Sequence, residues 1–287
     1  MQVIEALGKG LSNPKRAGLK LIRVAGMDAQ GWAADLIWNR LRDSNDEGFA
    51  KLVEQFSDDQ ARVHFGDHDP MEHELYRRAV RYFHAWIVQT LKARMGDTLL
   101  PATVVDVGDS DGMILKHLGK TGIGFNLSPD AIRNIEKNGI EAKLGDAQVL
   151  PFDDGEFDYV LCFETLEHVE NPHHVLQELA RICRDDGRIF LSIPWVPRTF
   201  IHPRDTNFPR GQMHIFEFCR KDFLSLCSHV PLTLKWSDVC WLFGRPTTLS
   251  QRLLLSMHLG DHIVCGVFRG FQFFELAPKS RALNGKA

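Results

Sequence analysis

The sequence predicts an α/β protein with a doubly wound, mainly parallel sheet that follows a helical N-terminal region. In the first 100 residues, apolar side chains recur at helical spacing. From residue 103 onwards, short β-branched runs alternate with amphipathic stretches, which is typical of βαβ units. A run over residues 104–107 leads into a glycine-containing turn that opens a helix, as at the ligand-binding edge of open α/β sheets.

The helical region is predicted to cover residues 1–100. Its apolar positions form two helical sets, which are Leu19, Leu21 and Ile22, and then Trp32, Ala33, Leu36, Ile37 and Leu41. A further helix is expected over residues 71–94, after a loop over residues 64–73 that contains Gly66 and Pro70. The second predicted domain covers residues 101–287, with insertions at about residues 195–220 and 240–261.

The elements of the sheet domain follow in order. Strands are expected over residues 103–107, 123–126, 140–144, 157–163 and 188–193, with helices over residues 113–118, 129–137 and 172–184. Ser128 and Pro129 form a start signal for the second helix, and Asn138 with Gly139 ends it. Gly187 is expected to end the third. A helix near residues 221–227 and strands over residues 232–239 and 262–275 complete the domain.

Composition narrows the function classes. The 34 Lys and Arg residues are balanced by 37 Asp and Glu residues, and the net charge of −3 disfavours a nucleic-acid partner. No apolar run reaches the roughly 18 residues of a membrane span, and the first residues lack the apolar core of a signal peptide. The six cysteines form no C-x-x-C pair, which favours free thiols in a reducing compartment. We therefore expect a cytoplasmic protein.

A series of short motifs follows the glycine turn in a fixed order. They are VVDVGDSDG from Val104 to Gly112, Gly145-Asp146-Ala147, Leu150-Pro151-Phe152, Phe157-Asp158, Glu164-Thr165-Leu166-Glu167-His168, Asp186-Gly187-Arg188 and Ser192-Ile193-Pro194. This succession resembles class I S-adenosylmethionine-dependent methyltransferases, in the small-molecule branch of ubiquinone and menaquinone methylases (type 11). The resemblance covers about residues 103–194. It implies S-adenosyl-L-methionine as cofactor and a Rossmann-like, seven-stranded sheet with an antiparallel last strand.

The resemblance also implies which residues bind the cofactor. Asp106, Gly108, Asp109, Ser110 and Gly112 would form the turn that holds its methionine part. Asn126 and Leu127 end the second strand, where the family normally has an acidic residue that holds the ribose. Asp146 and Ala147 would meet the adenine, and Phe163 and Glu164 would line the pocket. The preceding helical region would close over the cofactor as a lid.

The acidic turn supports the same cofactor on physical grounds. Asp106, Asp109 and Asp111 place three carboxylates around one turn, which attracts a sulfonium and an ammonium group and repels a phosphate. The G-x-G-x-x-G spacing of a dinucleotide site is absent. The alternative interpretation is that Asp109 and Asp111 only cap the following helix and point at water.

Methyl transfer to a hydroxyl needs alignment and a base. His168, His202 and His214 are the candidate bases because they follow the fourth and fifth strands, and Arg198 and Arg204 are candidates for binding an anionic group of the acceptor. The acceptor is expected to be a small molecule, a glycan or a lipid-linked molecule, methylated at oxygen. His168 can equally shape the pocket, and both arginines can be plain loop residues.

Other functions remain open at this point. A protein that binds S-adenosylmethionine with altered or lost catalysis is one, because Ser110 and Asn126 depart from the family pattern. The segment Gly108–Gly112 also reads G-x-S-x-G, so a serine hydrolase with Ser110 as nucleophile and His214 or His262 as partner is a second. A nucleic-acid methyltransferase is a third, disfavoured by charge and by FETLEH after the fourth strand.

Two further features of the sequence each have two interpretations. His64, His68, His73, Asp67, Asp69 and Glu72 form a metal-like cluster, but their loop placement predicts no metal site and favours a hinge or lid. The first 26 residues carry five basic side chains, and residues 249–259 are apolar, so one interpretation is peripheral contact with a membrane surface. An ordinary packed helix and a core or subunit contact are the respective alternatives.

Overall fold

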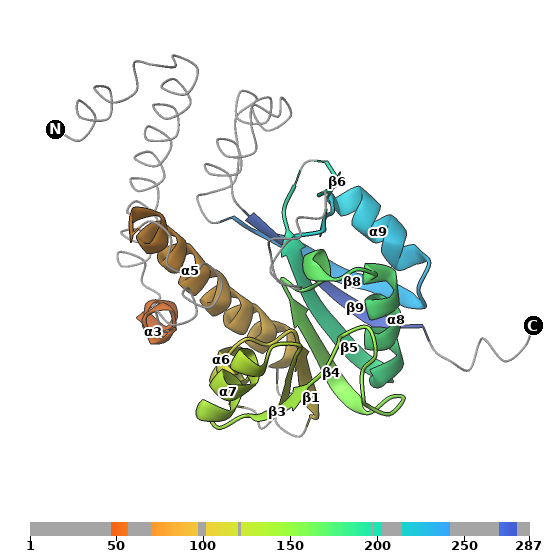
Figure 1. Ribbon diagram of the computed structural model, residues 1–287, viewed down its shortest axis with the longest axis horizontal. Coiled ribbons are helices and arrows are strands. Elements are labelled where there is room, and N and C mark those ends of the chain that lie inside the picture. The colour runs from red at the N-terminus through yellow and green to blue at the C-terminus, as the bar shows by residue number, and fades with distance from the viewer. Residues whose placement is uncertain are drawn as a thin grey trace, which may run out of the picture.

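The structure, a computed structural model, describes residues 47–56, 70–96, 102–119, 122–196, 198–202, 214–241 and 270–279. It contains a sheet in the order β3-β2-β1-β4-β5-β9-β8 (Figure 1). Its strands are β1 (Val104–Val107), β2 (Ile123–Asn126), β3 (Glu141–Leu144), β4 (Phe157–Phe163), β5 (Cys183–Pro194), β8 (Leu232–Trp241) and β9 (Gly270–Pro278). The first five are parallel, and β9 runs antiparallel to both β5 and β8. The predicted sheet with an antiparallel last strand is therefore confirmed.

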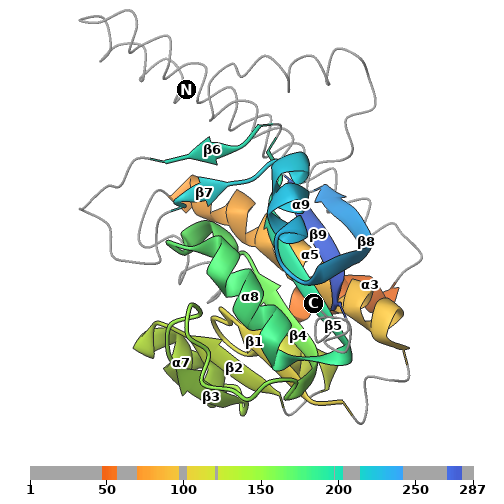
Figure 2. The same cartoon turned by 90° about the vertical axis from the view of Figure 1, so that its right-hand side faces the viewer.

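Helices cover both faces of this sheet (Figures 1 and 2). One face carries α3 (Glu47–Gln55), α5 (Pro70–Met95), α6 (Met113–Leu118) and α7 (Pro129–Lys137), and the other carries α8 (Pro172–Ile182) and α9 (Arg220–Ser228). Each face has its own apolar core, because alternate residues of a strand point to opposite sides. Val104 and Leu161 face the first group of helices, whereas Val105 and Val160 face the second.

Helix α5 is joined to the sheet through β9. The ring of Phe83 stacks on Phe271 with 3.8 Å between centroids, and Trp86 meets Phe273 edge-on at 5.3 Å. At the end of the helix, Arg94 Nε donates to Glu275 Oε2 at 2.7 Å. The described part of the predicted N-terminal region thus shares a core with the sheet. Its role as a lid, and a domain boundary at residue 100, stay predictions.

Local signals place the turns that carry the site. Gly112, with φ 73°, precedes α6. Ser128 Oγ accepts a hydrogen bond from the Asp130 N–H, Pro129 opens α7, and Asn138 caps its end. These predicted helix boundaries are confirmed, and they put the turns after β1 and β2 at the same edge of the sheet.

Several predicted boundaries were wrong, and four of them have consequences for the fold. Helix α8 ends at Ile182, because Cys183 already pairs with Phe157 as the start of β5, so Gly187 does not end a helix. Strand β3 begins at Glu141 rather than one residue earlier. Helix α5 begins at Pro70, whose fixed φ suits a first helical position, so residues 70–73 are not loop. Strand β9 continues beyond residue 275 to Pro278.

The segment after β5, predicted as an insertion at about residues 195–220, contains a small second sheet. Strand β6 (Phe200–Ile201) pairs antiparallel with β7 (Phe216–Glu217). Figure 2 shows this pair beyond the N-terminal end of α8. The signal was missed because two-residue strands leave no alternating pattern in a sequence.

Several predicted features lie outside the described residues. They are the helical sets before residue 47, the basic N-terminal segment, His64, His68, Asp67, Asp69, Arg204, the apolar residues 249–259 and His262. Of the helices that are described, none has the length and apolar character to cross a bilayer.

Candidate functional site

The first part of the site is the turn at the carboxyl end of β1. Gly108 has φ 94°, which favours glycine, and its N–H donates to Phe125 O of β2 at 2.7 Å. The side chain of Thr165, just after β4, fills the space that a Cβ on Gly108 would need. The turn after β1 and the segment after β4 are therefore in direct contact.

Asp109 and Asp111 shape this turn. Asp109 Oδ1 accepts from the N–H groups of Asp111 at 3.1 Å and Gly112 at 2.8 Å, and Asp111 Oδ1 accepts from the Met113 N–H at 3.0 Å. The capping interpretation is thus correct for their hydrogen bonds. Both side chains are buried, however, so neither points at water.

Burial and mutual repulsion disfavour the charged forms of these acids. Burial first, and then the charges of Asp109 and Asp111, raise the pKa of Asp106 well above its ordinary value. Burial, and then the charge of Asp111, raises the pKa of Asp109 to about 7, although backbone hydrogen bonds oppose the shift. A cationic group beside the turn would relieve this repulsion.

Asn126, at the end of β2, is tied to the same turn. Its Nδ2 donates to Asp109 O at 2.8 Å, and its Oδ1 accepts from the Ser128 N–H at 2.8 Å. The amide therefore links the turns after β1 and β2, and it retains a second donor hydrogen and a second lone pair. The neighbouring Leu127 is 44% exposed.

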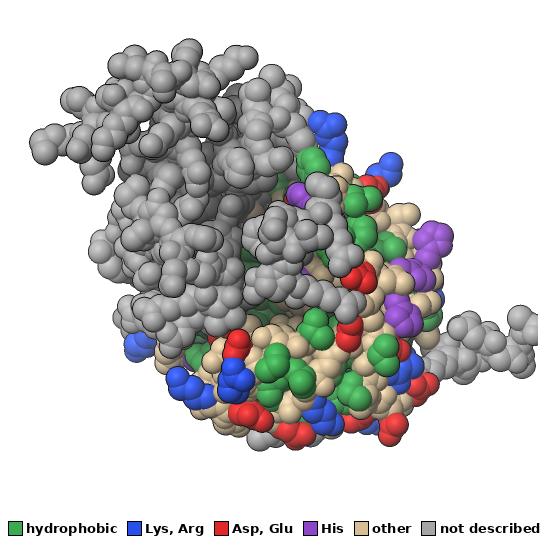
Figure 3. Space-filling model, viewed as in Figure 1, with side chains coloured by type: hydrophobic (Ala, Val, Ile, Leu, Met, Phe, Trp, Pro, Cys, Tyr) green, Lys and Arg blue, Asp and Glu red, His purple; other side chains and the backbone are tan. Residues whose placement is uncertain are grey.

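Beyond Leu127, further apolar side chains are exposed at and after the end of β3. Leu144 is 56% exposed and Val149 is 73% exposed. Figure 3 shows apolar side chains exposed on the region of α7 and β3. Asp146 and Ala147 lie between Leu144 and Val149 in the sequence, and both are half-buried. Asp146 Oδ1 accepts a hydrogen bond from the Gln148 N–H at 2.9 Å. An apolar surface beside a hydrogen-bonding carboxylate suits a planar heterocycle.

At the end of β4 the backbone is strained. Phe163 is buried, and Glu164 has φ 47°, which is uncommon for a residue other than glycine. Ser192 of β5 holds it there, because its carbonyl accepts from the Glu164 N–H at 3.2 Å and its Oγ donates to Glu164 Oε1 at 2.8 Å. Burial first, and then the charge of Glu167, raise the pKa of Glu164 well above its ordinary value. Such strain is concentrated at functional sites.

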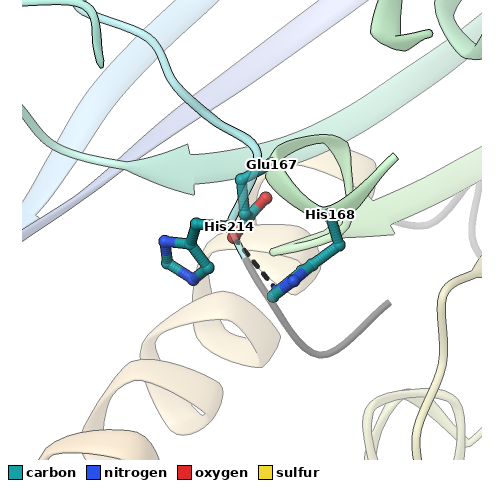
Figure 4. Close-up of side chains that lie close together, drawn as sticks. All are labelled: Glu167, His168 and His214. Atoms are coloured by element: carbon teal, nitrogen blue, oxygen red, sulfur yellow. Dashed lines mark ion pairs between the residues drawn. The ribbon is translucent and has the colours of Figure 1, made fainter. Parts of the chain in front are cut away.

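Next to Glu164 lies a group of acidic and imidazole side chains, Glu167, His168 and His214, which we call the glutamate–histidine centre. Glu167 and His168 belong to the 3-10 turn Leu166–His168, and His214 comes from the segment before β7 (Figure 4). The two imidazole rings lie 4.8 Å apart in an edge-to-face arrangement. His168 Nε2 is 4.0 Å from Glu167 Oε1.

Glu167 is the most buried member of the centre. It is 1% exposed, and neither carboxylate oxygen has a hydrogen-bond partner among the described residues. Burial raises the pKa of Glu167 to about 7, although the charge of His214 opposes this shift. A charged carboxylate in this position is costly, and a proton or a bound cation at Glu167 would relieve that cost.

The centre has the donor set of a metal site. One ligand atom from each of Glu167, His168 and His214 lies within 4.8 Å of the others. Carboxylate and imidazole together suit a divalent first-row metal such as Zn²⁺. The sequence predicted no metal, and its metal-like cluster lay elsewhere, near residues 64–73. The missed signal was the Glu-x-x-Glu-His spacing from Glu164 to His168, directly after a strand.

Glu217, which the sequence analysis did not single out, contacts two of the candidate bases, His202 and His214. Its Oε1 accepts from His214 Nδ1 at 2.8 Å, and its Oε2 lies 3.6 Å from His202 Nε2. Burial by itself would raise the pKa of Glu217, but the hydrogen bond and charges of the two histidines lower it below its ordinary value. His168, His202 and His214 are thus gathered in one place.

The remaining predicted residues have less defined surroundings. Arg198 is exposed, just before β6, and Arg204 lies outside the described residues. Ser110 is half-buried between two buried aspartates. His214, its candidate partner in a hydrolase, is hydrogen-bonded to Glu217, and His262 lies outside the described residues.

Comparison with known proteins identifies the sheet region. The family model described as "Methyltransferase domain" matches residues 105–191. The chain is 31% identical over 104 residues to a ubiquinone biosynthesis O-methyltransferase of Xanthomonas oryzae pv. oryzae, covering 33% of this chain and 44% of that protein. It is 32% identical over 118 residues to the protein of that name from Thiobacillus denitrificans, covering 37% and 51%. The chain therefore spans about half the length of these relatives.

A solved structure agrees with the fold. It is that of a protein from Galdieria sulphuraria assigned as a sarcosine dimethylglycine methyltransferase, which is 16% identical, covers 75% of this chain and 89% of that chain, and has a TM-score of 0.50. At this identity the likeness concerns the fold alone. The hydrolase alternative finds no support, since the matched methyltransferase region includes Ser110. Residues 105–191, just under a third of the chain, match this methyltransferase family, and the findings support a class I S-adenosylmethionine-dependent methyltransferase of the type 11 branch.

Proposed function

We propose that the protein transfers the methyl group of S-adenosyl-L-methionine to an oxygen of a small-molecule acceptor. The observation that carries this proposal is the glutamate–histidine centre beside the turn after β1. Thr165 touches Gly108, and the centre begins two residues later, at Glu167. A cofactor on the turn and an acceptor at the centre would be neighbours. The ubiquinone biosynthesis O-methyltransferases among its relatives favour oxygen as the methylated atom.

The cofactor would occupy the edge formed by the ends of the first four strands. Asp106, Asp109 and Asp111 would attract its ammonium and sulfonium groups. Gly108, Ser110 and Gly112 would form the turn around its methionine part, and Phe163 and Glu164 would close the pocket. Asn126 and Leu127 would contact the ribose, and Asp146 and Ala147 the adenine, next to the exposed Leu144 and Val149.

The acceptor would be held at the glutamate–histidine centre. Glu167, His168 and His214 would bind a divalent ion, which when present acts as a Lewis acid and lowers the pKa of a coordinated hydroxyl. The chain's own contribution is to fix the acceptor oxygen in line with the cofactor's methyl group and to exclude water. Arg198 and Arg204 would bind an anionic group of the acceptor. This acceptor could also be a glycan or a lipid-linked phenol.

Binding and turnover measurements together test this function. We expect calorimetric titration of the full chain with S-adenosylmethionine and S-adenosylhomocysteine to show binding, and titration with NAD to show none. Methyl transfer is followed with catechol as probe, because its two adjacent oxygens can share one metal ion. Zn²⁺ binding is measured separately, by competition with a chromogenic chelator after EDTA treatment.

Variants of the glutamate–histidine centre distinguish cofactor binding from methyl transfer to the acceptor. His168→Ala and His214→Ala should weaken Zn²⁺ binding and lower turnover while S-adenosylmethionine affinity stays within about twofold, since neither residue belongs to the turn after β1. Cofactor binding without transfer to catechol or a wider phenol panel would favour the alternative of a binding protein with lost catalysis. Absence of cofactor binding would overturn the assignment, and fluorophosphonate labelling of Ser110 would then test the hydrolase.

A further inference from the structure

Glu217 lies outside the glutamate–histidine centre but contacts it directly. It is the last residue of β7, and its side chain is 22% exposed. Its Oε1 accepts a hydrogen bond from His214 Nδ1 at 2.8 Å. Because a carboxylate only accepts, this bond places a hydrogen on Nδ1 and leaves Nε2, on the other edge of the ring, as the nitrogen that can act as ligand or base.

The backbone around Glu217 is fixed to both parts of the site. The Ile215 N–H donates to Glu167 O at 2.6 Å, so the segment that carries His214 is bound to the turn that carries Glu167 and His168. On its other side, the His202 N–H donates to Ile215 O at 2.9 Å, and Glu217 pairs with Phe200. The segment is therefore held between the centre and β6.

The second carboxylate oxygen of Glu217 faces His202. The distance from Oε2 to His202 Nε2 is 3.6 Å, and Nε2 has no hydrogen-bond partner among the described residues. Glu217 thus separates His202 from His214 while contacting both. A change at His202 can reach the centre through this carboxylate.

We propose that Glu217 is a positioning residue that fixes the ring orientation and tautomer of His214, so that Nε2 is presented to Glu167 and His168. The inference rests on the proposed function, because it assigns His214 Nε2 to the metal ion and the acceptor. Carboxylates that accept from the second nitrogen of a ligating histidine fix its tautomer, and their loss weakens metal affinity by about 10- to 100-fold. Glu217 has the position and the bond that such a role requires.

Three variants of the full chain test this role. Glu217→Ala removes both contacts and should weaken Zn²⁺ binding by about 10- to 100-fold, measured by chelator competition. Glu217→Gln keeps an oxygen that can accept from Nδ1, so its Zn²⁺ affinity should recover to within a few-fold of the wild type. Glu136→Ala, an exposed position on α7, is the control and should change nothing. The affinity for S-adenosylmethionine should stay within about twofold throughout.

A double-mutant cycle shows whether Glu217 acts through His214. The variant Glu217→Ala/His214→Ala should bind Zn²⁺ no more weakly than His214→Ala, because the carboxylate has no ring left to orient. Additive losses would overturn the positioning role. So would a Glu217→Gln variant as weak as Glu217→Ala.

The inference about Glu217 and the proposed methyl transfer can be refuted separately. If His214→Ala abolishes Zn²⁺ binding and Glu217→Ala leaves it intact, the inference about Glu217 is wrong and the centre stands. If the wild-type protein binds no Zn²⁺ but still methylates an acceptor, the metal centre and this inference are both wrong, and methyl transfer stands.

Discussion

Thr165 occupies the space beside Gly108 that any larger residue would need: a Cβ added to Gly108 would collide with Thr165 Oγ1, which itself lies 2.9 Å from Phe163 O. This contact brings the end of β4 against the turn after β1. If the proposed cofactor site is correct, a change at Gly108 would therefore affect cofactor binding and backbone geometry together.

Gly108→Ala should therefore weaken S-adenosylmethionine binding by at least about tenfold, because the turn must shift to clear Thr165. A positive φ adds strain of about 1–2 kcal/mol for any L residue. Calorimetric titration and urea unfolding measure the two effects.

The matched control is Gly139→Ala, since Gly139 has φ +78° and no atom lies within 4 Å of a Cβ added there. It should share the loss of stability and leave cofactor affinity unchanged. Equal cofactor affinity of Gly108→Ala and Gly139→Ala would argue against the turn as the binding site.

Asp109 should make the stability of the cofactor-free protein depend on pH. Its pKa is raised from 3.8 to about 7 by burial and by Asp111. The native state therefore keeps a proton that the unfolded chain has released, and the free energy of unfolding falls as pH rises between about 4 and 7. Asp109→Asn, which keeps the accepting Oδ1, should raise the unfolding free energy at pH 8 by at least about 1 kcal/mol, since one pKa unit is worth about 1.4 kcal/mol.

Urea unfolding at pH 5 and pH 8 checks this, with the exposed Asp153→Asn as control. The same Asp109→Asn variant should bind S-adenosylmethionine about tenfold more weakly, because it removes one negative charge. A variant whose stability falls with pH as steeply as the wild type would contradict the assignment of the shift to Asp109.

Replacing Asn126 with an acidic residue, as the family normally has at this position, should improve neither stability nor cofactor affinity. Its Nδ2 donates to Asp109 O at 2.8 Å, and a carboxylate at this position would face that carbonyl without a hydrogen. Asn126→Asp should lower the unfolding free energy by about 1–3 kcal/mol. We expect weaker cofactor binding from the disturbed turn.

Asn138→Asp offers a matched comparison, because Asn138 Nδ2 donates to Asp111 O at the same 2.8 Å from the far end of α7. Both variants should lose stability, and Asn126→Asp should lose more cofactor affinity. Tighter binding by Asn126→Asp would mean that a direct ribose contact outweighs the link between the two turns.

Arg94 should hold α5 against the sheet. Its guanidinium lies 2.6 Å from Glu275 Oε2 and over the Trp236 ring at 5.0 Å, and Glu275 is only 8% exposed. In the Arg94→Met variant, the Glu275 carboxylate still has Arg188 at 3.4 Å. The free energy of unfolding should fall by about 1–2 kcal/mol. This loss is smaller than for a fully buried ion pair because the Arg94 side chain is partly exposed.

Thermal unfolding and limited proteolysis before residue 96 measure the effect, with the exposed Lys92→Met as control on the same helix. Faster cleavage of Arg94→Met than of Lys92→Met is expected. Identical cleavage of the two variants would show that apolar packing holds α5 without a contribution from the Arg94–Glu275 ion pair.

The sequence alone determined the local elements of this protein. Ser128, Pro129 and Asn138 fixed α7 through hydrogen bonds within a few residues, and the apolar runs of β1 and β4 predicted buried parallel strands. It also placed the acidic turn and the motifs of a methyltransferase, because each of these is a continuous stretch of chain. Such signals are visible wherever cause and effect lie within one or two turns of backbone.

Only the tertiary structure decided what those elements bring together. Helix α8 stops at Ile182 because Cys183 pairs with a distant strand, and Glu164 takes φ 47° because Ser192 holds it. His168 and His214 are 46 positions apart in the sequence, yet their rings lie 4.8 Å apart, with Glu167 buried beside them and Glu217 behind. Long-range pairing and burial set these positions, and neither leaves a periodic pattern in the chain, since both depend on the whole sheet having formed.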